Sequence, residues 1–217
     1  MKKVRFIEPM SQKRSVYNRH IRYMPLMGPV LLATILSRQG YDARVYNENI
    51  TGSVLDDPEV FADLLRADAV GISVMTASAM RGYRIARRLK EEGARRVVFG
   101  GVHATFCPEE ALRHGDIVVA GEAESVIAGI VEGRVEQGIV RGEAVENLDT
   151  LPLPDLRLVH GFDRLWSGPE AKSLHAYPLV TSRGCPYGCR YCSVSALFGR
   201  RIRYRSAERV AEDVGHL

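Results

Sequence analysis

Two kinds of hydrophobic pattern alternate along the chain up to about residue 140. Short, nearly continuous apolar runs predict buried β-strands, and each is followed by a segment with helical spacing of apolar residues. The predicted strands cover residues 4–7, 43–46, 69–74, 96–99 and 117–120, and the clearest helices cover 29–38, 58–66 and 79–92. Strands and helices that alternate in this way form parallel βαβ units. We therefore expect an α/β protein with a Rossmann-like (flavodoxin-like) parallel five-stranded sheet and helices on both faces.

The hydrophobic periodicity lapses after residue 142. Prolines and glycines punctuate residues 143–176, which we interpret as an interdomain linker. Residues 177–181 resume a strand pattern, and Ser206 is a suitable N-cap for a last helix. The apolar face of that helix would hold Val210, Val214 and Leu217. The pattern thus predicts a sheet domain over residues 1–142, a linker over 143–176, and a second domain that begins at 177–217.

Residues with chemical potential cluster after the predicted strands. On open parallel sheets, ligands bind beyond the carboxyl ends of the strands. Glycines at this edge let a large ligand approach the backbone, although each could equally serve a tight strand-to-helix turn. The candidate binding residues at this edge are Ser73, Thr76, Gly100, Gly101, His103, Gly121 and Glu122.

Composition adds few limits to this picture. The 217 residues are 46% hydrophobic and 26% charged, which is ordinary for a globular protein. The net charge of +4 is small and the arginines are scattered, so the sequence requires no nucleic-acid partner. Neither a leader-like apolar region after Met1 nor a run long enough to span a membrane is evident. We expect a cytoplasmic protein.

Three of the four cysteines lie in one short loop, residues 182–193, which we call the cysteine loop. Cys185, Cys189 and Cys192 have C-x3-C-x2-C spacing, and the glycines and proline between them let the sulfurs converge. Thiolates bind iron–sulfur clusters and zinc. Three thiolates would leave one iron of a [4Fe–4S] cluster open to a small molecule. The alternative is zinc with a fourth ligand such as His175, although structural zinc sites usually offer two closely spaced pairs.

The cysteine loop, with Tyr191 just before its last cysteine, resembles the signature of the radical S-adenosyl-L-methionine (SAM) enzymes. The resemblance implies that Cys185, Cys189 and Cys192 hold a [4Fe–4S] cluster whose open iron binds SAM, with Tyr191 near the adenine. It also implies an external electron donor and reductive cleavage of SAM to a radical. Cys107 is isolated from the loop, and we interpret it as a packed thiol that the cluster does not need.

Two further motifs resemble the cobalamin-binding domain that precedes many radical SAM domains. They are GG-x-H-A-T after the fourth predicted strand and G-E-x-E after the fifth, and they imply cobalamin at the candidate residues named above. The chain lacks the D-x-H-x-x-G motif that supplies an axial histidine in classical cobalamin domains, as radical SAM members commonly do. We therefore interpret His20 as a solvated loop residue and His103 as a hydrogen-bonded rim residue, not as metal ligands.

The resemblance covers essentially the whole chain and implies the amino-terminal part of a cobalamin-dependent radical SAM enzyme acting on a small molecule or biosynthetic intermediate. Methyl transfer to an unactivated carbon is the leading expectation, with cyclisation or rearrangement as alternatives. A radical SAM enzyme without cobalamin and a non-enzymatic zinc or nucleotide-binding module stay open. Residues 177–217 would begin an incomplete (β/α) barrel. We therefore expect part of a longer protein that is inactive alone and self-associates through an unpaired barrel strand.

Overall fold

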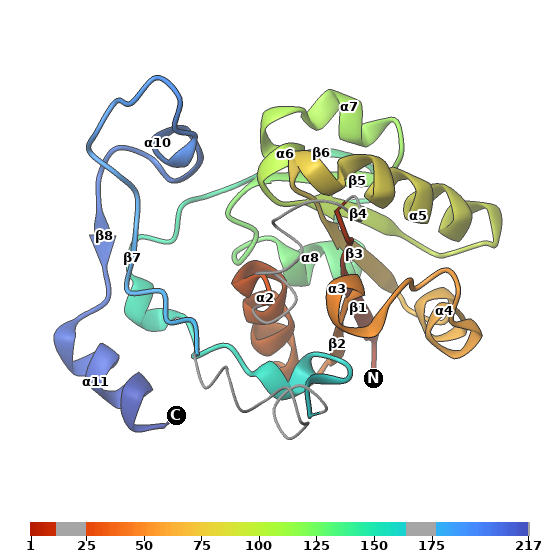
Figure 1. The fold of residues 1–217 in the computed structure, drawn as a ribbon, viewed down its shortest axis with the longest axis horizontal. Helices are drawn as coiled ribbons and strands as arrows, with labels where there is room; N and C mark the ends of the chain where they lie inside the picture. The colour runs from red at the N-terminus through yellow and green to blue at the C-terminus, as the bar shows by residue number, and fades with distance from the viewer. Residues whose placement is uncertain (12–24, 164–176, 217) are drawn as a thin grey trace.

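The computed structural model describes residues 1–11, 25–163 and 177–216, so His20 and His175 lie outside the described residues. One sheet of six parallel strands has the order β2-β1-β3-β4-β5-β6 (Figure 1). Its strands are β1 Lys3–Glu8, β2 Asp42–Asn47, β3 Ala69–Ser73, β4 Val97–Gly100, β5 Ile117–Gly121 and β6 Gly138–Gly142. The prediction of an α/β, Rossmann-like fold is confirmed, but the predicted number of strands was one too small.

The missed strand, β6, lies at the edge of the sheet beside β5. Its sequence begins and ends with glycine, and Ile139 and Arg141 are exposed while their neighbours are half-buried. Buried strands read as continuous apolar runs because both of their faces are covered. The edge strand β6 has no such run. Its pairing with β5 therefore depends on the tertiary structure and cannot be predicted from the hydrophobic pattern.

Helices cover both faces of the sheet. Helices α4 (Pro58–Leu65), α5 (Ala79–Glu91), α6 (Val102–Phe106) and α7 (Pro108–Leu112) pack on one face through one buried apolar cluster. Helices α2 (Met27–Arg38) and α8 (Ile127–Glu132) pack on the other face through a second cluster (Figure 1). A short helix, α3 (Glu48–Thr51), follows β2. The two clusters explain why the central strands are apolar on both sides.

The described part of the predicted linker packs against the sheet domain. It contains two 3₁₀ turns, η2 (Leu148–Thr150) and η3 (Leu156–Leu158). Leu148 and Leu151 are buried against Leu31 of α2, and Val159 forms an isolated parallel bridge with Val45 of β2. The apolar residues in this segment therefore extend the core over α2, and the boundary at residue 142 stays a prediction.

The described residues after 176 form a small separate layer, which we call the cysteine segment (177–216). It contains β7 (Ser182–Arg183), α10 (Val194–Phe198), β8 (Arg203–Tyr204) and α11 (Ala207–Gly215). The prediction of a strand over residues 177–181 was wrong, because β7 begins at Ser182 and pairs antiparallel with β8. A strand needs a hydrogen-bonded neighbour, and of residues 177–181 only Thr181 is seen to accept a backbone hydrogen bond, from the Arg205 amide at 2.8 Å.

The last helix begins where the sequence predicted it. The Ser206 hydroxyl accepts a hydrogen bond from the Arg209 amide at 3.1 Å, which confirms the N-cap. The predicted apolar face was wrong at Val214, which is 56% exposed, while Val210 is half-buried and Leu217 lies outside the described residues. The buried residue of α11 is Asp213. Asp213 pairs with Arg205 and Arg209, so charge pairing orients this helix. Among the described residues, no helix has both the length and the apolar character to cross a membrane.

Candidate functional site

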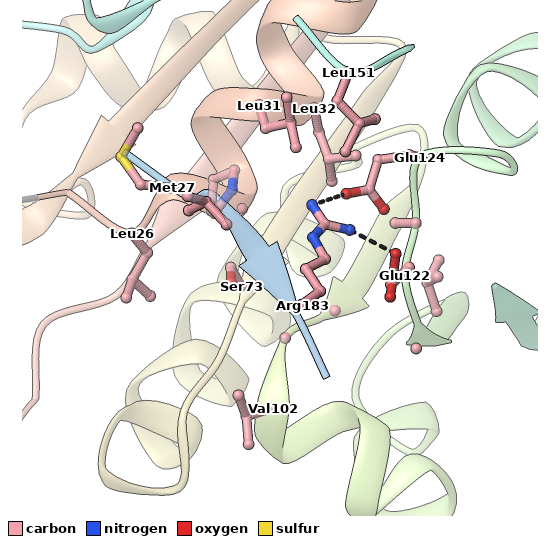
Figure 2. A pocket seen from close by; sticks show the side chains of 18 of the residues that line it. Leu26, Met27, Leu31, Leu32, Ser73, Val102, Glu122, Glu124, Leu151 and Arg183 are labelled. Atoms are coloured by element: carbon pink, nitrogen blue, oxygen red, sulfur yellow. Dashed lines mark hydrogen bonds and ion pairs between the residues drawn. The ribbon is translucent and has the colours of Figure 1, made fainter. Parts of the chain in front are cut away.

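A cavity of about 510 Å³ opens at the carboxyl ends of β3, β4 and β5. Its floor includes Ser73, Gly100 and Gly121, one from each strand end. Its walls include the start of α2, the segment around Leu151, and β7 and α10 of the cysteine segment. Figure 2 shows Met27, Leu151 and Arg183 around the cavity. The cavity volume lies in the range of small-molecule and cofactor sites, and most of its walls are apolar. The site therefore lies between the sheet domain and the cysteine segment.

Five of the seven predicted cobalamin contacts line this cavity: Ser73, Gly100, Gly101, Gly121 and Glu122. The other two, Thr76 and His103, do not line it. Instead, the His103 Nδ1 atom lies 3.3 Å from the Thr76 hydroxyl, and its Nε2 atom lies 3.0 Å from the Tyr83 hydroxyl. His103 is buried and hydrogen-bonded, in agreement with the sequence interpretation. A contact between any of the seven and cobalamin stays a prediction.

The glycines at the strand ends serve different purposes. Gly101 has φ +92°, and a Cβ atom there would lie 2.8 Å from the Val74 carbonyl oxygen. Gly121 has φ +97°, and its Cβ atom would lie 2.9 Å from the Gly142 carbonyl oxygen. At these two positions the backbone itself requires glycine. A Cβ atom on Gly100 would instead meet nothing within 4 Å, so Gly100 leaves open space in the cavity.

Glu122 is the centre of a buried ion-pair cluster, which we call the clamp (Glu122, Glu124, Arg183 and Arg203). Arg183 of β7 donates to Glu122 Oε2 and to Glu124 Oε1 at 2.6 Å each (Figure 2). Arg203 of β8 donates to both carboxylate oxygens of Glu122 and, at 2.6 Å, to the Val145 carbonyl oxygen. The clamp thus joins the end of β5 to both strands of the cysteine segment.

Contacts within the clamp favour the ionised forms of Glu122 and Arg183. Burial by itself raises the pKa of Glu122, but hydrogen bonds from Arg203 and the Val145 amide and the charge of Arg183 outweigh it and lower that pKa. Burial likewise disfavours the charge of Arg183, yet Glu124 and Glu122 together raise the pKa of Arg183. The clamp therefore places a fixed guanidinium beside an otherwise apolar cavity.

Sequence reasoning missed most of the clamp. Glu122 and Glu124 are the two acidic positions of the G-E-x-E motif, Arg183 lies at the start of the cysteine loop, and Arg203 follows the loop by ten residues. Nothing in the sequence shows that these residues, about 60 and 80 positions apart, form pairs. The available signal was only that three of the four charges lie in motifs already singled out.

The cysteine loop joins β7 to α10. The Cys185 amide donates to the Gly199 carbonyl oxygen at 3.1 Å, and the Cys192 amide donates to the Cys189 carbonyl oxygen at 3.2 Å. Gly184 has φ +94°, and a Cβ atom there would lie 2.2 Å from the Arg201 carbonyl oxygen. The loop therefore requires glycine immediately before its first cysteine, and this close approach brings the loop against the segment that leads into β8.

The chemistry of the loop fits a thiolate-bound cluster. All three loop cysteines are free thiols, Cys185 and Cys192 half-buried and Cys189 exposed. Three thiolates in one loop are the donor set of a cubane cluster that keeps one iron without a protein ligand. A structural zinc ion would need a fourth ligand from another part of the chain.

Tyr191, the predicted SAM contact, points away from the protein. Its side chain is 93% exposed, although the half-buried Cys192 follows it directly. Its position is compatible with a ligand-facing role, and the contact with SAM stays a prediction.

Comparisons with known proteins give a consistent set of relatives. Residues 22–131 match the family described as "B12 binding domain". Bacteriochlorophyllide d C-12(1)-methyltransferase of Chlorobaculum tepidum is 29% identical over 98% of this chain and 44% of its own length. The uncharacterized methyltransferase PH0819 of Pyrococcus horikoshii is 31% identical over 89% of this chain and 46% of its own length. The anaerobic magnesium-protoporphyrin IX monomethyl ester cyclase of Cereibacter sphaeroides is 27% identical over 86% of this chain and 34% of its own length.

A solved structure shows the same fold. The radical S-adenosylmethionine methyltransferase TsrM from Kitasatospora setae, with tryptophan substrate and a SAM analog bound, matches all of this chain and 45% of its own with a TM-score of 0.73. A second structure of TsrM, with cobalamin and a [4Fe–4S] cluster bound, gives a TM-score of 0.64. The sequence identities are 17% and 15%, so this likeness describes the fold alone. The chain spans less than half the length of the relatives named here.

Proposed function

This chain belongs to the B12 binding domain family, and from that premise we propose that it forms the cobalamin-binding and cluster-binding part of a radical SAM methyltransferase. The cavity at the carboxyl ends of β3–β5 would receive cobalamin, and Cys185, Cys189 and Cys192 would hold a [4Fe–4S] cluster that binds SAM. When bound, cobalamin supplies a transferable methyl group, and the cluster supplies the electron that cleaves SAM.

One observation carries this proposal: a single cavity has walls from both the sheet domain and the segment that bears the cysteine loop. Gly100 and Gly121 line it from the sheet, and Gly184, which directly precedes Cys185, lines it from the cysteine segment. Two cofactors that act on one substrate must lie near each other, since positioning supplies a large part of catalytic power. The clamp supports the proposal because it fixes these two walls relative to each other.

In this proposal the residues of this chain bind the two cofactors, orient them and shield the space between them from water. The apolar walls formed by Leu31, Leu151 and Phe198 exclude water from the space where a radical would react. The open space over Gly100 admits a flat ligand close to the sheet edge. The three thiolates of the loop would hold the cluster and would leave one iron without a protein ligand for SAM. The activity also requires further residues that hold the substrate. We therefore propose it for a protein of the relatives' length.

Methyl transfer is the reaction we favour, because two of the three relatives named above carry methyltransferase in their names. Cyclisation is the second candidate, since the third is a cyclase. The substrate would be a small molecule or biosynthetic intermediate with an unactivated carbon, and the enzyme would require an external electron donor.

Substitution at Gly100 tests the cobalamin site. Gly100→Leu fills the cavity without meeting any protein atom near its Cβ, whereas Gly101→Leu would strain the backbone and confuse binding with folding. We expect Gly100→Leu to weaken cobalamin binding at least about 100-fold, measured by equilibrium dialysis, while thermal unfolding stays cooperative. Gly215→Leu is the matched control, because Gly215 also meets nothing within 4 Å and does not line the cavity. Unchanged cobalamin affinity in Gly100→Leu would place the ligand elsewhere.

The absorption spectrum of anaerobically purified protein separates the competing functions. Cobalamin bands together with a broad iron–sulfur shoulder are expected for the proposed enzyme. A shoulder without cobalamin bands would indicate a radical SAM enzyme of a different kind. A spectrum with neither feature, from protein supplied with iron, sulfide and cobalamin, would favour a zinc or nucleotide-binding module.

A further inference from the structure

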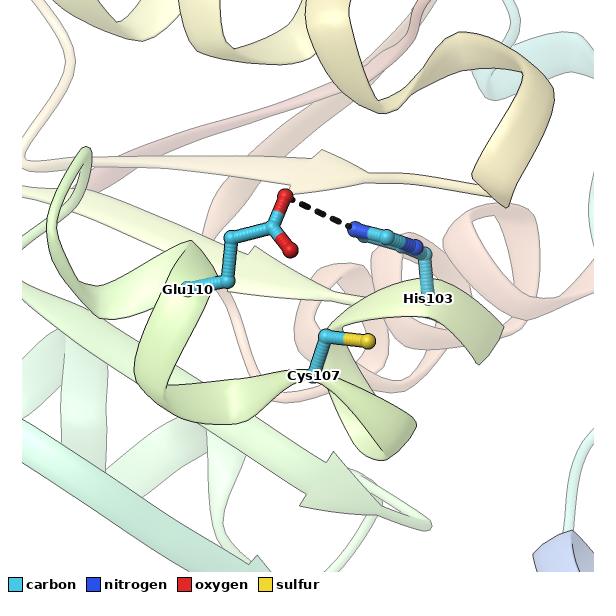
Figure 3. Close-up of side chains that lie close together, drawn as sticks. All are labelled: His103, Cys107 and Glu110. Atoms are coloured by element: carbon cyan, nitrogen blue, oxygen red, sulfur yellow. Dashed lines mark ion pairs between the residues drawn. The ribbon is translucent and has the colours of Figure 1, made fainter.

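A second cluster of metal-binding side chains lies outside the cavity. The ligand atoms of His103, Cys107 and Glu110 all lie within 4.8 Å of one another, and no other group of three His, Cys, Asp or Glu in the described residues does so (Figure 3). None of the three lines the cavity described above. They belong to α6 and α7, the two short helices that follow β4.

The local backbone explains why these side chains meet. The Cys107 amide donates to the His103 carbonyl oxygen at 2.8 Å, so Cys107 lies one helical turn after His103. Cys107 then ends α6, and α7 starts at Pro108, a residue suited to a first helical position. Glu110 lies in the first turn of α7 and faces back toward the imidazole, with its Oε1 atom 3.5 Å from His103 Nε2 (Figure 3).

Neighbouring residues orient the imidazole as they do in known metal sites. The Nδ1 atom of His103 lies 3.3 Å from the Thr76 hydroxyl, which leaves Nε2 directed at the cluster. The Tyr83 hydroxyl lies 3.0 Å from Nε2 and donates to Glu110 Oε1 at 3.1 Å. Nε2 therefore donates to the Tyr83 oxygen in the metal-free protein, and a zinc ion bound at Nε2 would take the place of that proton. Tyr83 is held in turn by His114, whose ring stacks on it at 4.0 Å.

We propose that His103 Nε2, Cys107 Sγ and the Glu110 carboxylate form a zinc site. A mixed set of one nitrogen, one sulfur and one oxygen ligand suits Zn²⁺ and does not suit Ca²⁺ or Mg²⁺, which take oxygen ligands. Three protein ligands leave one tetrahedral position for water or another small ligand. His103 is 8% exposed, whereas the Glu110 side chain is 41% exposed and opens a path for the ion. From the sequence alone we interpreted His103 as a hydrogen-bonded residue and not as a metal ligand. In the structure, the Cys107 thiol and the Glu110 carboxylate lie close enough to complete a set of three metal ligands with it.

The cysteine loop would also bind metals, so the test removes it first. In a variant of residues 1–217 with Cys185, Cys189 and Cys192 all changed to serine, Cys107 is the one cysteine that remains. Co²⁺ added anaerobically to this variant should give a near-ultraviolet cobalt–thiolate charge-transfer band at one equivalent. Zn²⁺ should abolish the band by displacement and raise the melting temperature. The titration uses protein without cobalamin and without the cysteine loop's thiols, so its outcome does not depend on the proposed function.

Substitutions in the same background identify the ligands. Cys107→Ala should remove the band, and Glu110→Gln, which can still accept the Tyr83 hydrogen bond, should weaken Co²⁺ binding at least about tenfold. Thr76→Val should weaken it by roughly 10- to 100-fold through loss of the hydrogen bond that orients His103. Glu109→Gln is the matched control for Glu110→Gln, because Glu109 is an exposed glutamate in the same first turn of α7 but is not among the proposed ligands, and it should leave the affinity unchanged. Absence of the band in the background variant, or equal affinity with Cys107→Ala, would overturn the proposal.

Discussion

The sheet domain and the cysteine segment are held in place by different forces. In the sheet domain the buried residues are mostly aliphatic and form continuous clusters on both faces of the sheet. In the described part of the cysteine segment the buried residues are Arg203 and Asp213, and both are charged. Hydrophobic burial is non-directional, whereas ion pairs and hydrogen bonds fix particular atoms at particular distances.

The comparison explains how a small layer with almost no core can hold a reactive loop over the sheet. The cysteine segment is too small to bury an apolar core of its own. Instead, Arg183 and Arg203 reach the carboxylates at the end of β5, and Arg205 donates to the Leu151 carbonyl oxygen at 2.9 Å. The loop is therefore positioned by contacts that depend on charge, and its attachment should respond to pH and salt more strongly than the sheet domain does.

The largest expected effect concerns the loop itself. Cys189→Ser should abolish cluster binding, since two remaining thiolates cannot hold the cubane that three would hold. Cys107→Ser should leave the cluster intact, because Cys107 lies in the sheet domain between α6 and α7. Iron and sulfide analysis of anaerobically reconstituted protein measures the cluster content of both variants. Equal iron loss in the two variants would show that the loop does not act as a separate ligand set.

The next largest effect breaks the clamp. Glu122→Gln removes the carboxylate from Arg203, whose side chain is 3% exposed, and leaves a buried guanidinium without its counter-charge. Loss of one partner of a buried pair costs about 3–5 kcal/mol. Relative to wild type, we expect Glu122→Gln to speed hydrogen exchange more in β7 and β8 than in β3 and β4. The variant should also have a lower free energy of unfolding in urea.

The pH dependence of that loss has a defined sign. The pKa of Glu122 is lowered in the folded protein, so its contribution is present at neutral pH and is lost as the pH falls below the ordinary glutamate range. The stability difference between wild type and Glu122→Gln should therefore shrink in acid. A difference that stays constant down to pH 3 would mean that the ionised clamp is not its source.

A smaller effect comes from Glu8 at the end of β1. Burial raises the pKa of Glu8 to about 8 despite a hydrogen bond from the Leu26 amide, and its Oε1 atom has no partner among the described residues. The unfolded chain releases this proton near pH 4.5, so wild-type stability should fall between about pH 5 and pH 8. Glu8→Gln mimics the protonated form and should remove that fall, on the order of 3 kcal/mol.

Urea unfolding at pH 5, 6.5 and 8 measures this effect of Glu8. Glu59→Gln, which changes an exposed glutamate in the first turn of α4, is the control and should keep the wild-type pH profile. If Glu8→Gln loses stability in parallel with wild type as the pH rises, another group accounts for the profile.

The smallest expected effect concerns an exposed contact of the cysteine segment. Glu146 pairs with Arg201, but their side chains are 69% and 72% exposed. Exposed pairs contribute at most about 1 kcal/mol because water and salt screen them. Glu146→Ala should change the urea midpoint only slightly and should not alter hydrogen exchange in β7. A loss as large as that of Glu122→Gln would mean that burial does not distinguish the two contacts.

The sequence by itself determined the features that depend on local pattern. The five apolar strands lie within one or two residues of their predicted positions, because a strand buried on both faces must be apolar throughout. The Ser206 cap and the single loop with three cysteines also follow from neighbouring residues. The candidate edge of the sheet was predictable because parallel strands end on the same side, and five of the seven candidate residues line one cavity there.

Only the tertiary structure decided which distant residues meet. Strand β6 and the β7–β8 pair depend on neighbours rather than on their own composition. The clamp joins Glu122 to Arg203, and the proposed zinc site depends on how α7 returns toward α6 after Cys107. Burial of a charge is costly unless a partner is present, and the position of that partner is set by the packing of the whole chain. For this reason the sequence predicts where strands and loops lie, while the charged contacts that orient them become visible only in the folded molecule.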